Sequence, residues 1–192
     1  MKAVRFTFLL VVMSTAAAVF AQTAHEHETP KDKVTPGAAE KAFSIMKSLA
    51  GEWEGKVTTD MPAASVNDKP LHVSMRVTSR GNVLVHEFQE AGTPLDPEKY
   101  DHPVTMLYVD SGQLNLVHYC DAGNRPHMTG KLSSDEKRID FQFAELGGSD
   151  KFGHMHEAAF TIIDKDHHIE QWKFILANGT VVNARFDLRR VK

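Results

Sequence analysis

The sequence predicts an all-β protein, an antiparallel up-and-down barrel of about ten strands with one short N-terminal helix. From residue 52 onward, apolar and polar side chains alternate with the period of two that is typical of half-buried strands. Turn sequences such as Arg80-Gly81-Asn82, Asp110-Ser111-Gly112 and Asn178-Gly179 separate these segments. No interval has the helical length that parallel crossovers need, and closing the sheet removes its exposed edges. A two-sheet sandwich is the alternative architecture.

The N-terminus has the three parts of a secretory signal peptide, predicted at residues 1–21. Lys2 and Arg5 give a positive start, an apolar run follows, and small residues precede a cleavage point ahead of Gln22. The apolar run is too short for a membrane anchor, so we expect no membrane insertion after signal removal and a secreted or periplasmic protein. Residues 22–37 are polar and interrupted by prolines, which predicts a flexible leader before a single domain at 38–192.

Within that domain, a helix is expected first because Phe43, Met46, Leu49 and Ala50 follow helical spacing, and Gly51 is a plausible stop. The strands that follow are predicted at residues 52–60, 70–80, 82–91, 102–110, 112–121, 126–133, 137–146, 154–164, 167–177 and 180–190.

Composition excludes some function classes. The net charge is −3 and there is no basic run, which argues against a nucleic-acid partner. Cys120 is the only cysteine, so no internal disulfide forms even though export is predicted. The sequence contains no Ser-His-Asp signature, phosphate loop or dinucleotide motif, and it identifies no catalytic residue.

Strand alternation places several imidazoles and the thiol on interior faces. His118 and Cys120 follow Leu114 and Leu116 on one face of their strand. His154 and His156 share a face with Phe160, His86 lies between Leu84 and Phe88, and Trp172 begins an apolar row. The predicted ligand-binding residues are therefore His86, His118, Cys120, His154, His156 and Trp172. His167 and His168, in contrast, follow a turn and are expected to be solvated.

A group of buried imidazoles predicts a site, because each one buried without a partner costs about 1–3 kcal/mol. His118, Cys120, His154 and His156 could hold a transition metal such as zinc, with an open position for catalysis. Alternatively, Cys120 could act as a nucleophile beside a histidine, or the histidines could line the rim and bond to loop carbonyls. The simplest alternative is a pocket for a small apolar molecule.

The stretch LAGEWEGK, residues 49–56, follows the helix and precedes the strand meander. This arrangement resembles the nitrobindin-like and wider calycin (lipocalin-like) barrels. Together with LVHYCDAGNRPHM and HMH, it resembles an uncharacterised family of exported bacterial barrel domains of unknown function. The resemblance implies that Trp53 plugs one end and that Gly55 permits close packing. It also implies haem binding through one histidine, for which His118, His154 and His156 are candidates.

The sequence therefore predicts an exported binding barrel rather than an enzyme, with an interior or rim His/Cys site. The expected ligand is a small apolar or metal-containing molecule. A metal-dependent enzyme and a nitrobindin-like haem protein are the alternatives.

Overall fold

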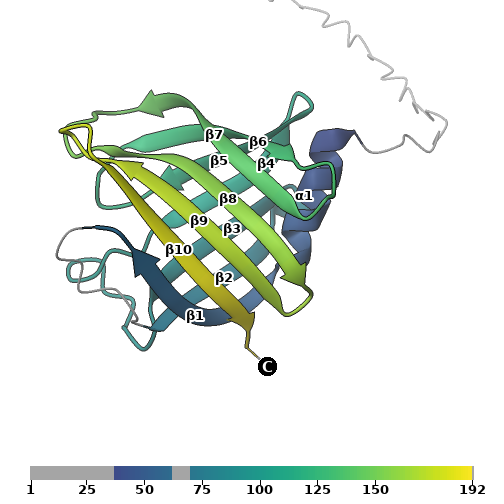
Figure 1. Ribbon diagram of the computed structural model, residues 1–192, viewed down its shortest axis with the longest axis horizontal. Coiled ribbons are helices and arrows are strands. Elements are labelled where there is room, and N and C mark those ends of the chain that lie inside the picture. Colours follow the sequence, from purple (N-terminus) through teal and green to yellow (C-terminus); the bar gives the residue numbers. More distant parts are fainter. Residues whose placement is uncertain (1–36, 62–69, 192) are drawn as a thin grey trace, which may run out of the picture. The chain divides into compact units, whose positions relative to one another are not determined.

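The structure is a computed structural model that describes residues 37–61 and 70–191 (Figure 1). The predicted signal peptide and the leader up to residue 36 lie outside the described residues. The described elements are the helix α1 (Ala38–Ser48) and the strands β1 (Gly51–Thr59), β2 (Pro70–Thr78), β3 (Val83–Glu90), β4 (Val104–Asp110), β5 (Gln113–Tyr119), β6 (Arg125–Leu132), β7 (Arg138–Gly147), β8 (His154–Asp164), β9 (His167–Ile175) and β10 (Val181–Arg190), with a short 3-10 turn at Ser79–Gly81.

The strands form one closed barrel in the order β1-β10-β9-β8-β7-β6-β5-β4-β3-β2. Every neighbouring pair is antiparallel, and β1 pairs with both β2 and β10, which closes the sheet. The barrel prediction is confirmed, and no predicted strand end is more than two residues from the observed one. The strand ends could be predicted from the turn residues because a tight turn between two strands determines where each of them stops.

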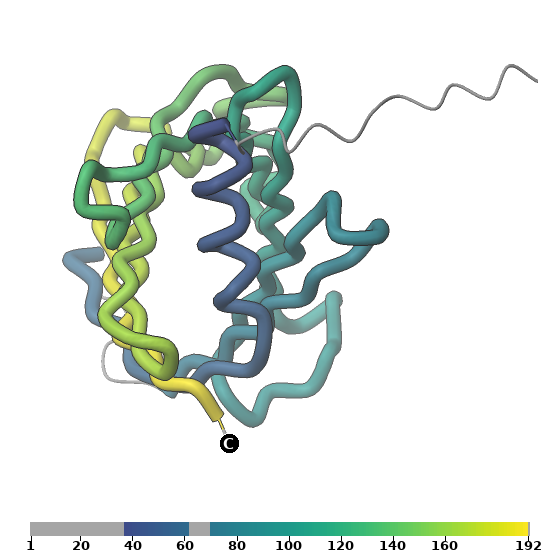
Figure 2. The backbone as a smooth tube through the Cα atoms, turned by 90° about the vertical axis from the view of Figure 1, so that its right-hand side faces the viewer, coloured from purple at the N-terminus to yellow at the C-terminus, as the bar shows by residue number. Residues whose placement is uncertain are grey.

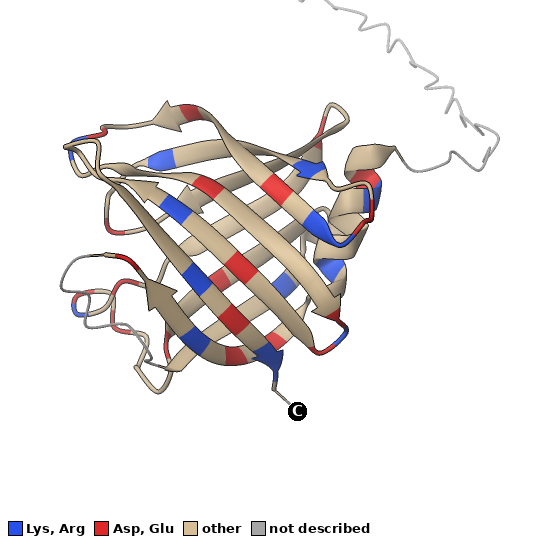
Figure 3. Ribbon diagram, viewed as in Figure 1, with Lys and Arg blue, Asp and Glu red and all other residues tan. Residues whose placement is uncertain are grey.

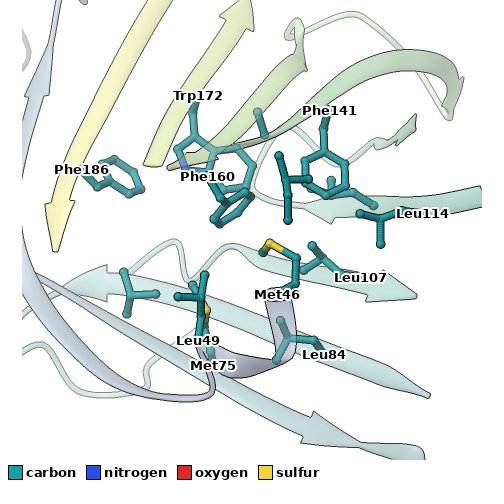
Figure 4. Close-up of a cluster of buried hydrophobic side chains, with 14 of the residues drawn as sticks. Met46, Leu49, Met75, Leu84, Leu107, Leu114, Phe141, Phe160, Trp172 and Phe186 are labelled. Carbon is teal, nitrogen blue, oxygen red and sulfur yellow. The ribbon is translucent and has the colours of Figure 1, made fainter. Parts of the chain in front are cut away.

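One end of the barrel is closed by α1, which runs across it in Figure 2. The helix buries Ala39, Ala42, Phe43 and Met46, spaced to share one face, and contacts β4, β5 and β6. Figure 4 shows Met46 beside Leu107 in the buried cluster. We call this the helix end of the barrel, and we call the opposite end, where β3 and β5 finish and β4 begins, the mouth end.

Trp53 joins the helix to the barrel wall. Its indole is fully buried, and its Nε1 donates to the carbonyl of Leu49 over 2.8 Å. The guanidinium of Arg190 lies 4.1 Å from the centroid of the Trp53 ring and donates from Nη1 to the carbonyl of Ala50. These contacts connect the last strand to the chain segment that leaves α1.

Close strand packing also requires Gly55, on β1. A Cβ atom at this position would lie 1.8 Å from the backbone oxygen of Asp187 on β10, far inside van der Waals contact. Glycine is therefore needed here for the close approach of two backbones.

The outer surface of the barrel carries interspersed charges of both signs (Figure 3). On neighbouring strands β8 and β9, Glu157 and Lys173 form an ion pair of 2.6 Å, and Arg185 pairs with Asp187 along β10 at 3.0 Å. Among the described residues, no helix has the length and apolar character needed to cross a membrane.

Candidate functional site

A row of polar side chains crosses three neighbouring strands inside the barrel. His86 on β3 is the direct partner of Thr105 on β4, which in turn is the partner of His118 on β5. All three are buried, with exposed fractions of 0 %, 0 % and 1 %. Thr105 Oγ1 and His118 Nδ1 are hydrogen bonded at 2.8 Å. The row places two imidazoles side by side in an interior that is otherwise mainly apolar.

Glu170 on β9 lies at the centre of a second buried cluster. His86 reaches it from β3, with Nε2 at 3.1 Å from each carboxylate oxygen. His168 Nε2 lies 3.0 Å from Oε1, and Trp172 Nε1 donates to Oε2 over 2.9 Å. The side chains of Glu170, His86 and His168 are fully buried, so this interaction has no solvent screening.

The pKa of Glu170 is well below its ordinary value. Burial raises the pKa, but this is outweighed by the charge of His86 and by hydrogen bonds from His168 and His86. An ionised carboxylate only accepts hydrogen bonds, so His86 Nε2 and His168 Nε2 carry the hydrogens. The buried Glu170 can stay ionised because its partners supply both hydrogen-bond donors and compensating positive charge.

Several imidazoles in the described part of the chain have a buried ring nitrogen without a hydrogen-bond partner, and among them His118 is the one that lines the cavity described next. Its Nδ1 is bonded to Thr105, whereas its buried Nε2 has no hydrogen-bond partner among the described residues. Burial, reinforced by the nearby charge of His86, lowers the pKa of His118 to about 3. The ring is therefore neutral at physiological pH, and Nε2 is the nitrogen left for a ligand.

A cavity of about 600 Å³ occupies the mouth end of the barrel, and both His118 and Trp172 line it. The two rings lie together, with centroids 5.6 Å apart, and we call them the floor of the cavity. Apolar side chains dominate the walls, which include Val57, Leu71, Phe88, Met155, Phe174 and Phe186. This volume and lining are typical of pockets for small molecules.

Charged and polar residues surround the outer part of the cavity. Cys120 is half-buried and free, and the exposed side chains of Lys99, Asp101 and Asp121 also line it. Burial, together with the charges of Asp101 and Asp121, raises the pKa of the Cys120 thiol. The thiol is thus less reactive than an ordinary cysteine, which gives no support to the alternative in which Cys120 acts as a nucleophile.

His154 and His156 do not line this cavity, whereas Met155 between them does. The pairing of β8 with β9 shifts register between Met155 and Glu157, so His156 is the extra residue of a bulge. Both imidazoles are half-buried and contact the ring of Phe143, at centroid distances of 4.9 and 5.0 Å.

The structure does not assemble the four residues predicted to hold a metal. In the described part of the chain, no three His, Cys, Asp or Glu side chains are grouped so that they could hold a metal ion. His118 and Cys120 share the cavity, but His154 and His156 lie apart from its lining. The residues present therefore do not fit the zinc centre that the sequence pattern indicates.

The expectation that His168 is solvated is wrong, because its side chain is fully buried between Glu170 and Trp53. Sequence reasoning also missed Glu170. The signal was present in the alternation itself: extending the inward row of Trp172 and Phe174 backward by steps of two reaches Glu170 and His168. His86 was correctly placed inside, but it lies beside Trp172 rather than in the cavity lining.

Comparison with known proteins supports the fold alone. No protein-family model and no curated protein sequence matches the chain. Among solved structures, the chain is similar to Rv2717c from M. tuberculosis, with a TM-score of 0.58 and 15% identity over 79% of this chain and 98% of that one. A protein of unknown function of the DUF3598 family from Nostoc punctiforme matches with a TM-score of 0.49 and 12% identity, over 76% of this chain and 49% of that one.

Proposed function

We propose that this barrel binds a small, mainly apolar molecule in the cavity at its mouth end. The observation that carries the proposal is a cavity of about 600 Å³ with apolar walls and, at its floor, one buried imidazole nitrogen that has no hydrogen-bond partner within residues 37–61 and 70–191. Apolar walls supply affinity through burial of ligand surface, and a single polar group fixes orientation. Because His118 is neutral, its Nε2 can form one hydrogen bond to a ligand without introducing charge.

The Glu170 cluster supports this role from beneath the floor. Trp172 lines the cavity with its ring while its Nε1 is held by Glu170. His86 is hydrogen bonded to the same carboxylate, and its ring centroid lies 5.7 Å from that of Trp172. The floor is thus fixed before a ligand arrives, which reduces the entropy lost on binding.

The test is titration with the fluorescent apolar probe N-phenyl-1-naphthylamine. We expect saturable binding that Ala184→Leu, which adds volume to the cavity wall, weakens strongly. Ala144→Leu makes the same change at an exposed position and serves as the matched control. Absence of saturable binding to the folded protein, or equal binding by both variants, would contradict the proposal.

Haem is a second candidate, favoured by the same nitrogen. A neutral imidazole with a free Nε2 is the form that ligates haem iron, and His118 would be the residue that holds it. The resemblance to nitrobindin-like barrels points the same way. The charged residues around the mouth favour the first candidate instead, because haem carries two carboxylates and Lys99 is the one basic residue in the described lining. A Soret band on hemin titration that His118→Leu abolishes would select haem.

The location expected from the sequence, secreted or periplasmic, belongs to the same proposal. Cell fractionation with detection of the mature N-terminus tests it. Recovery of the uncleaved chain in the cytoplasmic fraction would contradict it.

A further inference from the structure

Two carboxylates stand together at the mouth of the cavity. Asp101 and Asp121 both line it, and the charge of Asp121 acts on Asp101. Asp101 precedes β4 and Asp121 follows β5, two strands that pair along their length, which explains why the side chains meet. Burial, reinforced by Asp121, raises the pKa of Asp101 above its ordinary value.

Neither carboxylate has a cationic side chain as an ion-pair partner among the described residues. The described ion pairs of the barrel include Glu157 with Lys173 and Asp187 with Arg185, but none involving Asp101 or Asp121. The backbone N–H of Asp121 donates to Asp101, and the charge of the neighbouring His102 also lowers the pKa of Asp101, but burial and the charge of Asp121 outweigh both effects. Lys99 is the one Lys or Arg side chain in the described lining, and its Nζ lies over the ring of Tyr100, 5.1 Å from the centroid.

An independent observation at the other end of the same cavity points to a ligand. His118 is 1 % exposed and lines the floor, and its Nε2 has no hydrogen-bond partner in the part of the chain that the structure describes. The cavity therefore presents a neutral hydrogen-bonding group at the floor, apolar walls along its length, and carboxylates at the mouth, where Glu90 at the end of β3 adds to the pair of Asp101 and Asp121. A molecule that matches this sequence of groups has an apolar body and a positively charged outer end.

We propose that the ligand of this cavity is a cationic amphiphile, an apolar amine whose ammonium group lies between Asp101 and Asp121. The inference rests on the proposed binding function and specifies the class of ligand. The apolar body fills the space between Phe88, Phe174 and Phe186, and the ammonium group relieves the repulsion between the two carboxylates. An anionic amphiphile of the same length meets that repulsion instead.

The experiment compares three ten-carbon probes whose end groups differ in charge: decylamine is cationic, decan-1-ol is neutral and decanoate is anionic. Each displaces N-phenyl-1-naphthylamine at pH 7 and low salt, below its micelle concentration. We expect decylamine to bind about tenfold more tightly than decan-1-ol, with a preference that salt reduces. In Asp101→Asn/Asp121→Asn the ratio of the two affinities should fall to about one.

The matched control is Glu40→Gln/Asp110→Asn, which removes two exposed carboxylates at the helix end and should keep the wild-type ratio. Equal affinity of the wild type for decylamine and decan-1-ol, or tighter binding of decanoate, overturns the inference while the binding function stands. Equal loss of the ratio in both double variants also overturns it, because the preference would then follow net charge. If none of the probes nor the fluorophore binds, the proposed function fails as well.

Discussion

His86 and Glu170 meet across the interior of the barrel, with the imidazole Nε2 of one 3.1 Å from both carboxylate oxygens of the other. Their strands, β3 and β9, are not neighbours, since β2, β1 and β10 lie between them on the shorter path around the sheet. The contact is therefore a tertiary link between opposite walls rather than a pairing within the sheet. It holds the polar layer on which the cavity floor rests.

Glu170→Gln should lower the free energy of unfolding by about 3–5 kcal/mol, because the amide cannot accept hydrogen bonds from His86, His168 and Trp172 as the carboxylate does. Urea denaturation followed by circular dichroism measures the change. Glu157→Gln, which disrupts a half-exposed ion pair with Lys173, should cost at most about 1 kcal/mol. Similar losses in the two variants would contradict the role of Glu170 as the centre of the cluster.

Stability should fall on acidification, in a window that His118 sets. In the unfolded chain His118 takes up a proton once the pH falls below its ordinary pKa of 6.5. The folded protein excludes this proton until the pH reaches about 3, because the pKa of His118 is lowered to that value. Stability is therefore lost as pH falls through this range, by about 1.4 kcal/mol per unit for one proton. Glu170 contributes in the same direction below pH 4.5, because its folded pKa is lowered and its stabilisation disappears only on protonation.

The measurement is the free energy of unfolding between about pH 5 and 6, where ordinary carboxylates are largely ionised. His118→Gln should reduce the slope of the free energy of unfolding against pH by the contribution of the one proton that His118 binds on unfolding. Glu157→Gln leaves the histidines in place and should keep the wild-type slope. An unchanged slope in His118→Gln would show that the folded protein takes up the proton at this position.

Gly55→Ala should destabilise the barrel by about 3 kcal/mol or more, because the added methyl meets the backbone oxygen of Asp187 and the strands must separate. The matched control is Gly147→Ala, where the new atom would lie no closer than 3.4 Å to its neighbours. Thermal unfolding of the two variants provides the comparison. A loss no larger than that of the control would mean that β1 and β10 can shift apart without cost.

Arg190→Ala should release the end of α1 from the barrel. The guanidinium covers Trp53 and donates to the carbonyls of Ala50 and Ser48, so its loss removes a stacking contact and two hydrogen bonds at this end of α1. It also removes a third hydrogen bond, from Nε to the carbonyl of Lys165 between β8 and β9. Amide hydrogen exchange should become faster in residues 38–50 while β6 and β7 keep their protection. Arg190→Lys keeps the charge without the planar group and should restore only part of the protection. Uniformly faster exchange across the barrel would indicate a global effect instead.

The fold could be predicted from sequence because alternation and turn residues both act locally. The site could be predicted only in part, since burial of charge depends on partners distant in the chain. Glu170 contradicts the general rule that carboxylates face solvent. The exception depends on His86, 84 residues away in the chain, in addition to the nearby His168 and Trp172. At His154 and His156 a bulge interrupts the period of two, so alternation could not assign their faces.

The division of the barrel into a packed half and a hollow half separates two kinds of change. Side chains that pack near α1, such as Met46, Leu84 and Leu107, contribute to the hydrophobic core but are absent from the cavity lining. The walls near the mouth, including Phe88 and Phe174, can therefore be varied with less effect on folding. Scaffolds of this kind lend themselves to redesign: new ligand preferences can be selected at one end while the other preserves the fold.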